Sequence, residues 1–206
     1  MKYQVGIVDY NMGNLASVIN AFEKIGVHAS VESSPSNLNK YDKLVLPGVG
    51  AFGNAMKHLR ANGIDKAVIQ FAQSGKPLLG ICLGMQLLFE SSEEFGNHDG
   101  LGLIEGEVKL FDKTLFDHAL KIPHMGWNEM FVTKSSPIFE GLRSDFYLYF
   151  VHSYHVVCDE EFVTGVTNYG YEFVSSVKKG NIYGFQPHPE KSHDNGLKIL
   201  ENFTKL

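Results

Sequence analysis

The sequence predicts an α/β protein with an open, mixed but largely parallel sheet flanked by helices, together with an additional antiparallel β extension. Two observations predict this class. In the first half, apolar runs of strand length alternate with segments whose apolar residues recur at helical spacing. In the second half, strand-like runs follow one another with turn residues between them. No repeat or linker separates the halves, so residues 1–206 are expected to form a single domain.

The first half begins with a predicted strand and helix. Residues 3–9 (YQVGIVD) are β-rich, and apolar residues from Leu15 to Ile25 then recur on one helical face. Asn14 can cap the start of this helix and Gly26 can end it. Two further strands are predicted over residues 27–32 and 43–47.

Helical faces follow between residues 56 and 71, with an interruption at Asn62-Gly63. Residues 76–82 (KPLLGIC) are predicted as a strand and residues 85–92 (MQLLFESS) as the next helix. In the second half, β-type runs occupy residues 103–111, 128–134, 146–157, 162–169, 172–179 and 181–186. A final helix is expected over residues 196–206.

Composition excludes several classes of protein. The chain has 18 Lys and Arg against 23 Asp and Glu and no basic run, which argues against binding to nucleic acid or an anionic membrane. No stretch is long and apolar enough to span a membrane, and the start lacks a signal-peptide pattern, so a cytoplasmic location is expected. The two cysteines, Cys82 and Cys158, lack the spacings of zinc or disulfide sites. Both are therefore predicted to be reduced thiols, and neither a metal nor a cofactor is expected.

The most informative pattern is Gly80-Ile81-Cys82-Leu83-Gly84, at the junction of a predicted strand and helix. It has the form of a nucleophile elbow, in which flanking glycines are needed because side chains there would collide across the strained turn. The free N–H groups of the following helix would face the sulfur and favour its thiolate form. The alternative is a buried cysteine that packs as a small apolar residue.

A cysteine nucleophile needs a base, and the chain has nine histidines. His152 and His155 are three residues apart in a β run, so their side chains are predicted to fall on opposite faces, which argues against a shared metal. His124 and His188 remain as candidates. The other five lie in helical, turn or polar surroundings and are expected to be solvated: His28, His58, His98, His118 and His193.

His188 is the preferred base because it lies in Gln186-Pro187-His188-Pro189-Glu190, where two prolines stiffen the backbone. Glu190 could orient the ring, which completes a Cys-His-Glu triad. The alternative is that this segment is only a rigid surface turn. Acyl transfer also needs oxyanion donors, and the glycines of Pro47-Gly48-Val49-Gly50 let a backbone N–H approach the reacting centre. The N–H of Leu83 would supply the second donor.

These motifs together identify a resemblance to the class I (triad) glutamine amidotransferases. The resemblance rests on GICLGMQLLFESS, LPGVGAFG, PHMGWN and QPHPEKS. Within that family, the chain resembles the glutaminase subunits of imidazole glycerol phosphate synthase over nearly its whole length. Three motifs follow the order that they have in those subunits: IVDYNMGNLASV, KIPHMGWNE and YFVHSYHV.

The resemblance implies a fold of the class I glutamine amidotransferase type and a mechanism. Cys82 would attack the side-chain amide of glutamine, and His188, held by Glu190, would transfer the proton to the departing ammonia. Gly50 and Leu83 would bind the oxyanion. Gln86, Glu94, Ser153 and Tyr154 would hold the amino-acid end of glutamine.

A partner is also implied by the resemblance. Ammonia would pass to a (β/α)8-barrel cyclase subunit that builds it into imidazole glycerol phosphate in histidine synthesis. Segments that face this partner in the family match Asn11, Asn14, Met125, Trp127 and Lys191, although capping and packing are the alternative roles for Asn14 and Trp127.

The sequence departs from the family pattern in two places, with Asn11 in place of a glycine and Pro187 in place of a phenylalanine. Asn tolerates positive φ better than other non-glycine residues, so the turn at Asn11 can survive. Because both changes lie where partner choice could be tuned, one alternative is a related glutaminase that supplies ammonia to a sugar-modifying amidotransferase in surface-glycan synthesis. A separate alternative, from another functional class, is a non-catalytic scaffold subunit with a vestigial triad.

Overall fold

The computed structural model describes residues 4–206 and confirms the predicted α/β class. Tyr3, which begins the first predicted strand, lies outside the described residues. The central strands are β1 (Val5–Val8), β2 (Ala29–Glu32), β3 (Lys43–Gly48), β4 (Leu78–Cys82) and β13 (Ile182–Phe185). They pair in parallel in the order β2-β1-β3-β4-β13. Helices return the chain to the same edge of the sheet between β1 and β4, whereas the β extension lies between β4 and β13.

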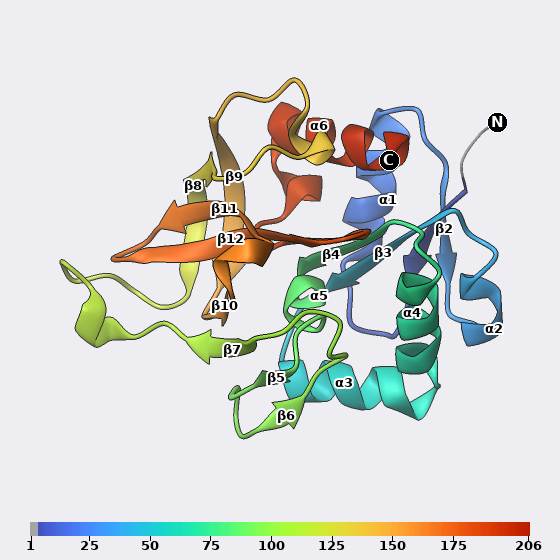
Figure 1. Cartoon of the computed structure of the whole chain (residues 1–206), viewed down its shortest axis with the longest axis horizontal. Helices are drawn as coiled ribbons and strands as arrows, with labels where there is room; N and C mark the ends of the chain where they lie inside the picture. The colour runs from blue at the N-terminus through green and yellow to red at the C-terminus, as the bar shows by residue number, and fades with distance from the viewer. Residues whose placement is uncertain (1–3) are drawn as a thin grey trace.

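Helices cover both faces of this sheet (Figure 1). The helices are α1 (Leu15–Lys24), α2 (Pro35–Leu38), α3 (Phe52–Ala61), α4 (Ile64–Gln73), α5 (Leu83–Gln86) and α6 (His193–Lys205). α1 and α6 lie over one face, while α3, α4 and α5 lie over the other. Strand residues alternate between two cores: Leu44 and Leu46 pack with Phe52 and Phe71, whereas Val45 packs on the face of Phe22. This two-sided burial explains the continuous apolar runs of the central strands.

The ends of the first helices behave as predicted. Asn14 caps α1, and its side chain accepts a hydrogen bond from the Ser17 N–H at 3.5 Å. Gly26 follows α1 with φ at 75°, and Gly63 separates α3 from α4 with φ at 70°. Asn11 also has a positive φ, at 67°, so the expected turn is retained without glycine.

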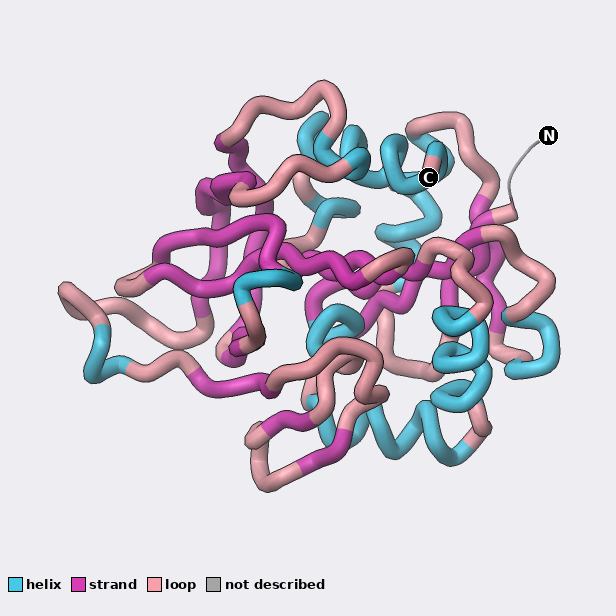
Figure 2. The backbone as a smooth tube through the Cα atoms, viewed as in Figure 1, coloured by secondary structure: helices cyan, strands magenta, loops and turns pink. Residues whose placement is uncertain are grey.

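The second half extends the sheet with antiparallel strands, as predicted. These are β7 (Glu107–Leu110), β8 (His124–Val132), β9 (Asp145–His152), β10 (Tyr154–Val157), β11 (Val163–Asn168) and β12 (Glu172–Lys179). The two-residue strands β5 (Ser91–Ser92) and β6 (His98–Asp99) were not predicted; β5 pairs in parallel with β7 and antiparallel with β6. β12 pairs with β13 and continues to β10, β7 and β5, while β11, β8 and β9 branch from β12. Figure 2 shows these strands as a projection on one side of the helix-covered sheet.

The helix predicted over residues 85–92 is wrong in its extent. The helix α5 spans Leu83–Gln86, and a turn then leads to β5 at Ser91. It ends early because carbonyl groups that would continue it are taken by a later segment. Leu101 N–H donates to the Leu87 carbonyl at 2.9 Å, and Leu103 N–H donates to the Leu88 carbonyl at 2.8 Å. Within residues 4–206, no helix combines the length and hydropathy that a membrane crossing needs.

Candidate active site

Three motifs that are far apart in the sequence meet at one edge of the sheet. β3 ends at Gly48, β4 at Cys82 and β13 at Phe185, and these strands are parallel neighbours. Gly48 lies opposite Cys82 in the register, and Ile81 lies opposite Phe185. Because parallel strands bring their carboxyl ends to a common edge, the glycine-rich loop, the elbow and the Pro-His-Pro-Glu turn are neighbours.

The backbone at Cys82 confirms the predicted elbow. Cys82 has φ 54° and ψ −113°, a conformation that side-chain-bearing residues rarely adopt. A Cβ at Gly84 would lie 1.8 Å from the Leu46 carbonyl oxygen, and one at Gly80 would lie 2.7 Å from the Gly84 carbonyl oxygen. The two glycines are therefore required by close backbone approach between α5 and the sheet.

The Cys82 sulfur faces a cavity of about 280 Å³ at the carboxyl edge of the sheet. The thiol is 3.9 Å from the Val151 carbonyl oxygen, and the Gln186 amide Nε2 is 3.8 Å from the sulfur. The cavity is lined by Val49, Gly50, Cys82, Leu83, Gln86, Glu94, Pro123, Val151, His152, Ser153, Tyr154 and His188. The nucleophile candidate and the candidate substrate residues thus share one cavity.

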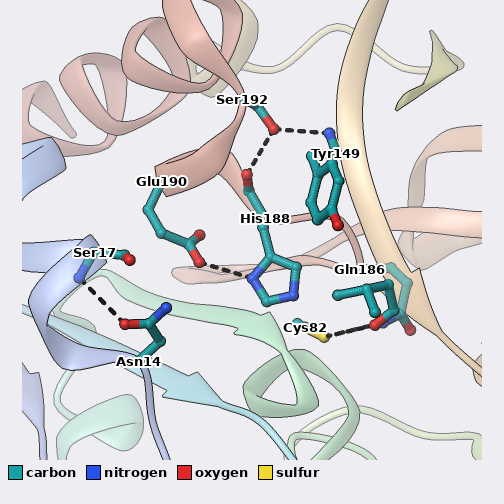
Figure 3. A network of polar contacts seen from close by, with 9 residues as sticks. Asn14, Ser17, Cys82, Tyr149, Gln186, His188, Glu190 and Ser192 are labelled. Atoms are coloured by element: carbon teal, nitrogen blue, oxygen red, sulfur yellow. Dashed lines mark hydrogen bonds and ion pairs between the residues drawn. The ribbon is translucent and has the colours of Figure 1, made fainter. Parts of the chain in front are cut away.

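His188 and Glu190 form a buried ion pair beside this sulfur (Figure 3). His188 Nδ1 is 2.7 Å from Glu190 Oε1, and each side chain is only 2% exposed. The backbone holds the imidazole firmly, because the His188 N–H donates to the Tyr149 carbonyl at 2.8 Å and its carbonyl accepts from Ser192 Oγ at 2.6 Å. Ser192 Oγ also accepts from the Tyr149 N–H at 2.9 Å, which ties this turn to β9.

The other ring nitrogen, Nε2 of His188, points toward Cys82 (Figure 3) and has no hydrogen-bond partner among the described residues. Burial lowers the pKa of His188, but the charge of the Cys82 sulfur and the bond to Glu190 outweigh it and raise the pKa to about 10. The structure therefore brings Cys82, His188 and Glu190 together and favours a protonated imidazole beside the sulfur. Such an imidazolium can donate a proton to a leaving group.

This electrostatic coupling gives the first testable prediction. In the wild-type protein, the His188 imidazole should lose its proton only as the pH rises through about 10. In Cys82→Ala, the sulfur's charge is gone while burial still lowers the pKa, so the proton should leave at a clearly lower pH. Imidazole ¹⁵N chemical shifts followed through a pH titration measure both values. Equal titration of the two proteins would contradict the coupling.

The glycine-rich loop lies against the elbow. Gly50 has φ 97°, and both Gly50 and Leu83 line the cavity, which places the predicted oxyanion donors at the same opening. The Val49 N–H, however, donates to the Met12 carbonyl at 3.1 Å. The buried Tyr10 hydroxyl donates to the Pro47 carbonyl at 2.8 Å and so holds the start of the loop. One amide of this loop is thus committed away from the cavity.

Gln86 and Glu94 carry acceptor atoms at the cavity. Gln86 Nε2 donates to the Tyr154 carbonyl at 3.0 Å and to Gln186 Oε1 at 2.9 Å, which uses both of its hydrogens and leaves Oε1 as an acceptor. Glu94 lies in the turn after β5, and its Oε2 accepts from the Phe52 N–H at 2.6 Å. Ser153 and Tyr154 also line the cavity.

The residues assigned to partner contact lie outside the cavity. Asn11 and Lys191 are exposed, and Asn14 is the half-buried helix cap. Met125 and Trp127 alternate with less exposed positions along β8 and are 62% and 46% exposed. Trp127 stacks on His193, with ring centroids 5.0 Å apart and an interplanar angle of 3°. Two large exposed apolar side chains on one strand face are typical of a docking surface.

The prediction that His152 and His155 face opposite sides of a strand is wrong. The run breaks at Ser153 between β9 and β10, and both rings pack against Phe111, with centroids 5.2 and 4.8 Å away. No group of three or more His, Cys, Asp or Glu side chains within residues 4–206 is arranged to hold a metal. Both cysteines are free thiols, as predicted.

Sequence reasoning missed three residues at this site. Gln186 contacts the sulfur, Tyr10 supports the glycine-rich loop, and His152 lines the cavity. Gln186 and Tyr10 lie inside motifs that the sequence already singled out, QPHPEKS and IVDYNMGN. His152 was missed because residues 146–157 were predicted as one continuous strand, whereas β9 ends at His152.

Comparisons with known proteins agree with this geometry. Residues 6–206 match the family model described as glutamine amidotransferase class-I. The chain is 66% identical over 202 residues to the imidazole glycerol phosphate synthase subunit HisH of Sulfurimonas denitrificans, covering 98% of this chain and 97% of that relative. It is 61% identical over 203 residues to the subunit of the same name from Wolinella succinogenes, covering 98% and 99%. Its fold is similar to the structure of PurLQS from Thermotoga maritima, with a TM-score of 0.77, 21% identity and coverage of 100% and 99%.

Proposed function

The chain belongs to the class-I glutamine amidotransferase family, and on that premise we propose that it is the glutaminase subunit of imidazole glycerol phosphate synthase. In this role it hydrolyses glutamine to glutamate and channels ammonia to a (β/α)8-barrel cyclase subunit, which makes imidazole glycerol phosphate and AICAR in histidine biosynthesis. The identity of 66% and 61% to two subunits of that name, over nearly the full length, is the observation that carries the proposal. We place residues 1–206 in one such domain, acting in the cytoplasm without a cofactor.

The proposed reaction starts from the pair of Cys82 and His188. The sulfur of Cys82 attacks the side-chain carbonyl carbon of glutamine, and the C–N bond breaks as His188 Nε2 donates its proton to the departing ammonia. A γ-glutamyl thioester remains on Cys82. His188 then takes a proton from water, which attacks the thioester and releases glutamate and the thiol. Glu190 orients the imidazole through Nδ1 and stabilises its charge.

Substrate binding follows from the atoms that remain free at the cavity. Gln86 Oε1 and Glu94 Oε1 are acceptors suited to the α-ammonium of glutamine, since their other polar atoms are already hydrogen-bonded. The Ser153–Tyr154 segment then meets the α-carboxylate. Gly50 and Leu83 supply the N–H groups for the oxyanion. Asn11, Asn14, Met125, Trp127 and Lys191 form the proposed surface for the cyclase subunit.

The test is glutamate release by the isolated chain, and by the chain with its cognate barrel subunit and that subunit's ligand. Because the flexible Gly48 and Gly50 let the Gly50 N–H point away from the oxyanion until the partner docks, we expect little activity alone and an increase of about 10- to 100-fold on docking. The complex should also form imidazole glycerol phosphate from glutamine.

Each other outcome has a definite meaning. High turnover by the isolated chain would contradict partner-dependent activation. Glutamate release without imidazole glycerol phosphate would indicate a different ammonia acceptor, such as a sugar-modifying amidotransferase. No glutamate release even in the complex would indicate a non-catalytic subunit.

A further inference from the structure

Two buried histidines form a hydrogen-bonded pair beside the cavity, and the proposed mechanism uses neither. His124 begins β8 and lies opposite His152, the last residue of β9, in the register of these paired strands. Their exposed fractions are 3% and 6%, and His124 Nδ1 is 3.0 Å from His152 Nε2. The His124 ring also stacks between Phe150 and Tyr169, with centroids 4.8 and 4.1 Å away. Packing therefore fixes the His124 ring plane.

The direction of the hydrogen bonds made by these two rings can be assigned by starting from the Tyr154 carbonyl oxygen. His152 Nδ1 is 2.8 Å from the Tyr154 carbonyl oxygen, which can only accept, so Nδ1 of His152 carries the proton. His152 Nε2 must then accept from the Nδ1–H of His124. His124 Nε2 in turn accepts from Asn128 Nδ2 at 3.2 Å. Both rings are thereby neutral and hold their proton on Nδ1.

Burial supports the neutral state of both rings. It lowers the pKa of His124 to about 4, and it lowers the pKa of His152 well below its ordinary value, helped by the neighbouring His124. With all four ring nitrogens engaged, neither histidine offers a free nitrogen to serve as a base. They can therefore affect the cavity only through the groups to which they are hydrogen-bonded.

The pair holds the cavity wall at the Tyr154 carbonyl. This oxygen accepts from His152 and also from Gln86 Nε2 at 3.0 Å, so two side chains fix it from different elements. The preceding carbonyl, of Ser153, accepts from the Phe111 N–H at 3.1 Å. Because the Tyr154 N–H shares a peptide plane with the Ser153 carbonyl and points the opposite way, these bonds fix the direction in which the segment presents this donor to an anionic ligand group.

We propose that His124 and His152 are positioning residues for glutamine binding, a neutral imidazole pair that sets the Ser153–Tyr154 segment against the α-carboxylate. This inference rests on the proposed function of the cavity as the glutamine site. Since that end of glutamine does not change during the reaction, the pair should act on ground-state and transition-state binding alike. Its loss should raise KM and leave kcat nearly unchanged.

The experiment compares three variants in complex with the cyclase subunit, with kcat and KM measured for glutamine. His124→Phe keeps an aromatic ring between Phe150 and Tyr169 but removes the donor to His152, and it should raise KM about tenfold. His124→Asn keeps an amide donor at the place of Nδ1 and should stay within about twofold of wild type. His155→Phe is the matched control, because His155 is buried on Phe111 outside the chain of bonds, and its KM should stay within about threefold.

The outcomes separate this inference from the proposed function. An inactive wild-type complex would overturn the proposed function. An active wild type with equal KM values for His124→Phe and His124→Asn would overturn only the positioning role, as would an equal rise in His155→Phe. If His124→Phe does not fold, ¹⁵N imidazole spectra of the wild-type chain decide: two neutral rings protonated on Nδ1 support the pair, and any other tautomer of His152 overturns it.

Discussion

Replacing Cys82 with alanine should reduce glutamate release by the complex by at least about 10⁴-fold, since among residues 4–206 no other cysteine lines the cavity to form the thioester. Ammonia-dependent synthesis by the cyclase subunit and binding between the subunits should stay at wild-type levels. The sulfur is buried at the elbow, and alanine retains the Cβ there. The strained backbone conformation therefore changes little, and the loss of glutamate release measures the loss of the nucleophile rather than of the fold. Glutamate release and imidazole glycerol phosphate formation are measured with glutamine and with ammonium salts.

The chain supplies its own control, because its second cysteine is remote from the cavity. Cys158 follows β10, does not line the cavity, and has its pKa raised to about 11 by burial, so it is poorly suited to be a nucleophile. Cys158→Ala should therefore keep glutamate release within about twofold of wild type. Retained glutamate release in Cys82→Ala would end the assignment of the nucleophile.

The parts that sequence reasoning predicted well are those that depend on local chemistry. The elbow was predictable because its two glycines stand at fixed offsets from Cys82, and the structure shows backbone atoms where their side chains would be. Convergence of the elbow with the glycine-rich loop also followed from the alternating pattern, because strand-helix alternation implies parallel strands that bring their carboxyl ends to one edge. The position of the turn at His188 did not follow from it, since residues 181–186 were expected in the second half, whereas β13 pairs in parallel with β4.

The parts that it missed depend on partners that are distant in sequence. Residues 87–92 have helical composition, yet the carbonyl groups of Leu87 and Leu88 accept hydrogen bonds from N–H groups within residues 101–104. The local sequence contains no pattern that predicts these bonds. His152 was misplaced for a similar reason. The chain changes its strand partners at Ser153, from β8 to β7 and β12, and the bond to His124 arises from the pairing of β8 with β9. The commitment of the Val49 N–H to Met12 likewise joins two loops.

The second large effect is expected at Gly84, where the elbow meets the sheet. A Cβ at this position would lie 1.8 Å from the Leu46 carbonyl oxygen of β3, a backbone atom with no freedom to rotate away. Gly84→Ala must therefore push α5 off the sheet, at a cost of about 3 kcal/mol in the free energy of unfolding. Urea denaturation of the isolated chain measures this loss.

A displaced α5 should also impair catalysis, because the helix begins at Leu83 immediately after the nucleophile. A shift of about 1 Å in a reacting group can cost about 10²-fold in rate, so kcat of the complex should fall by that order at a temperature where Gly84→Ala stays folded. Gly75→Ala is the matched control. Gly75 is exposed and has φ 82° with no atom within 4 Å of a built Cβ, so its substitution should cost only about 1 kcal/mol through backbone strain and leave kcat unchanged. Equal losses in the two variants would contradict the contact between α5 and β3 as the reason that Gly84 is necessary.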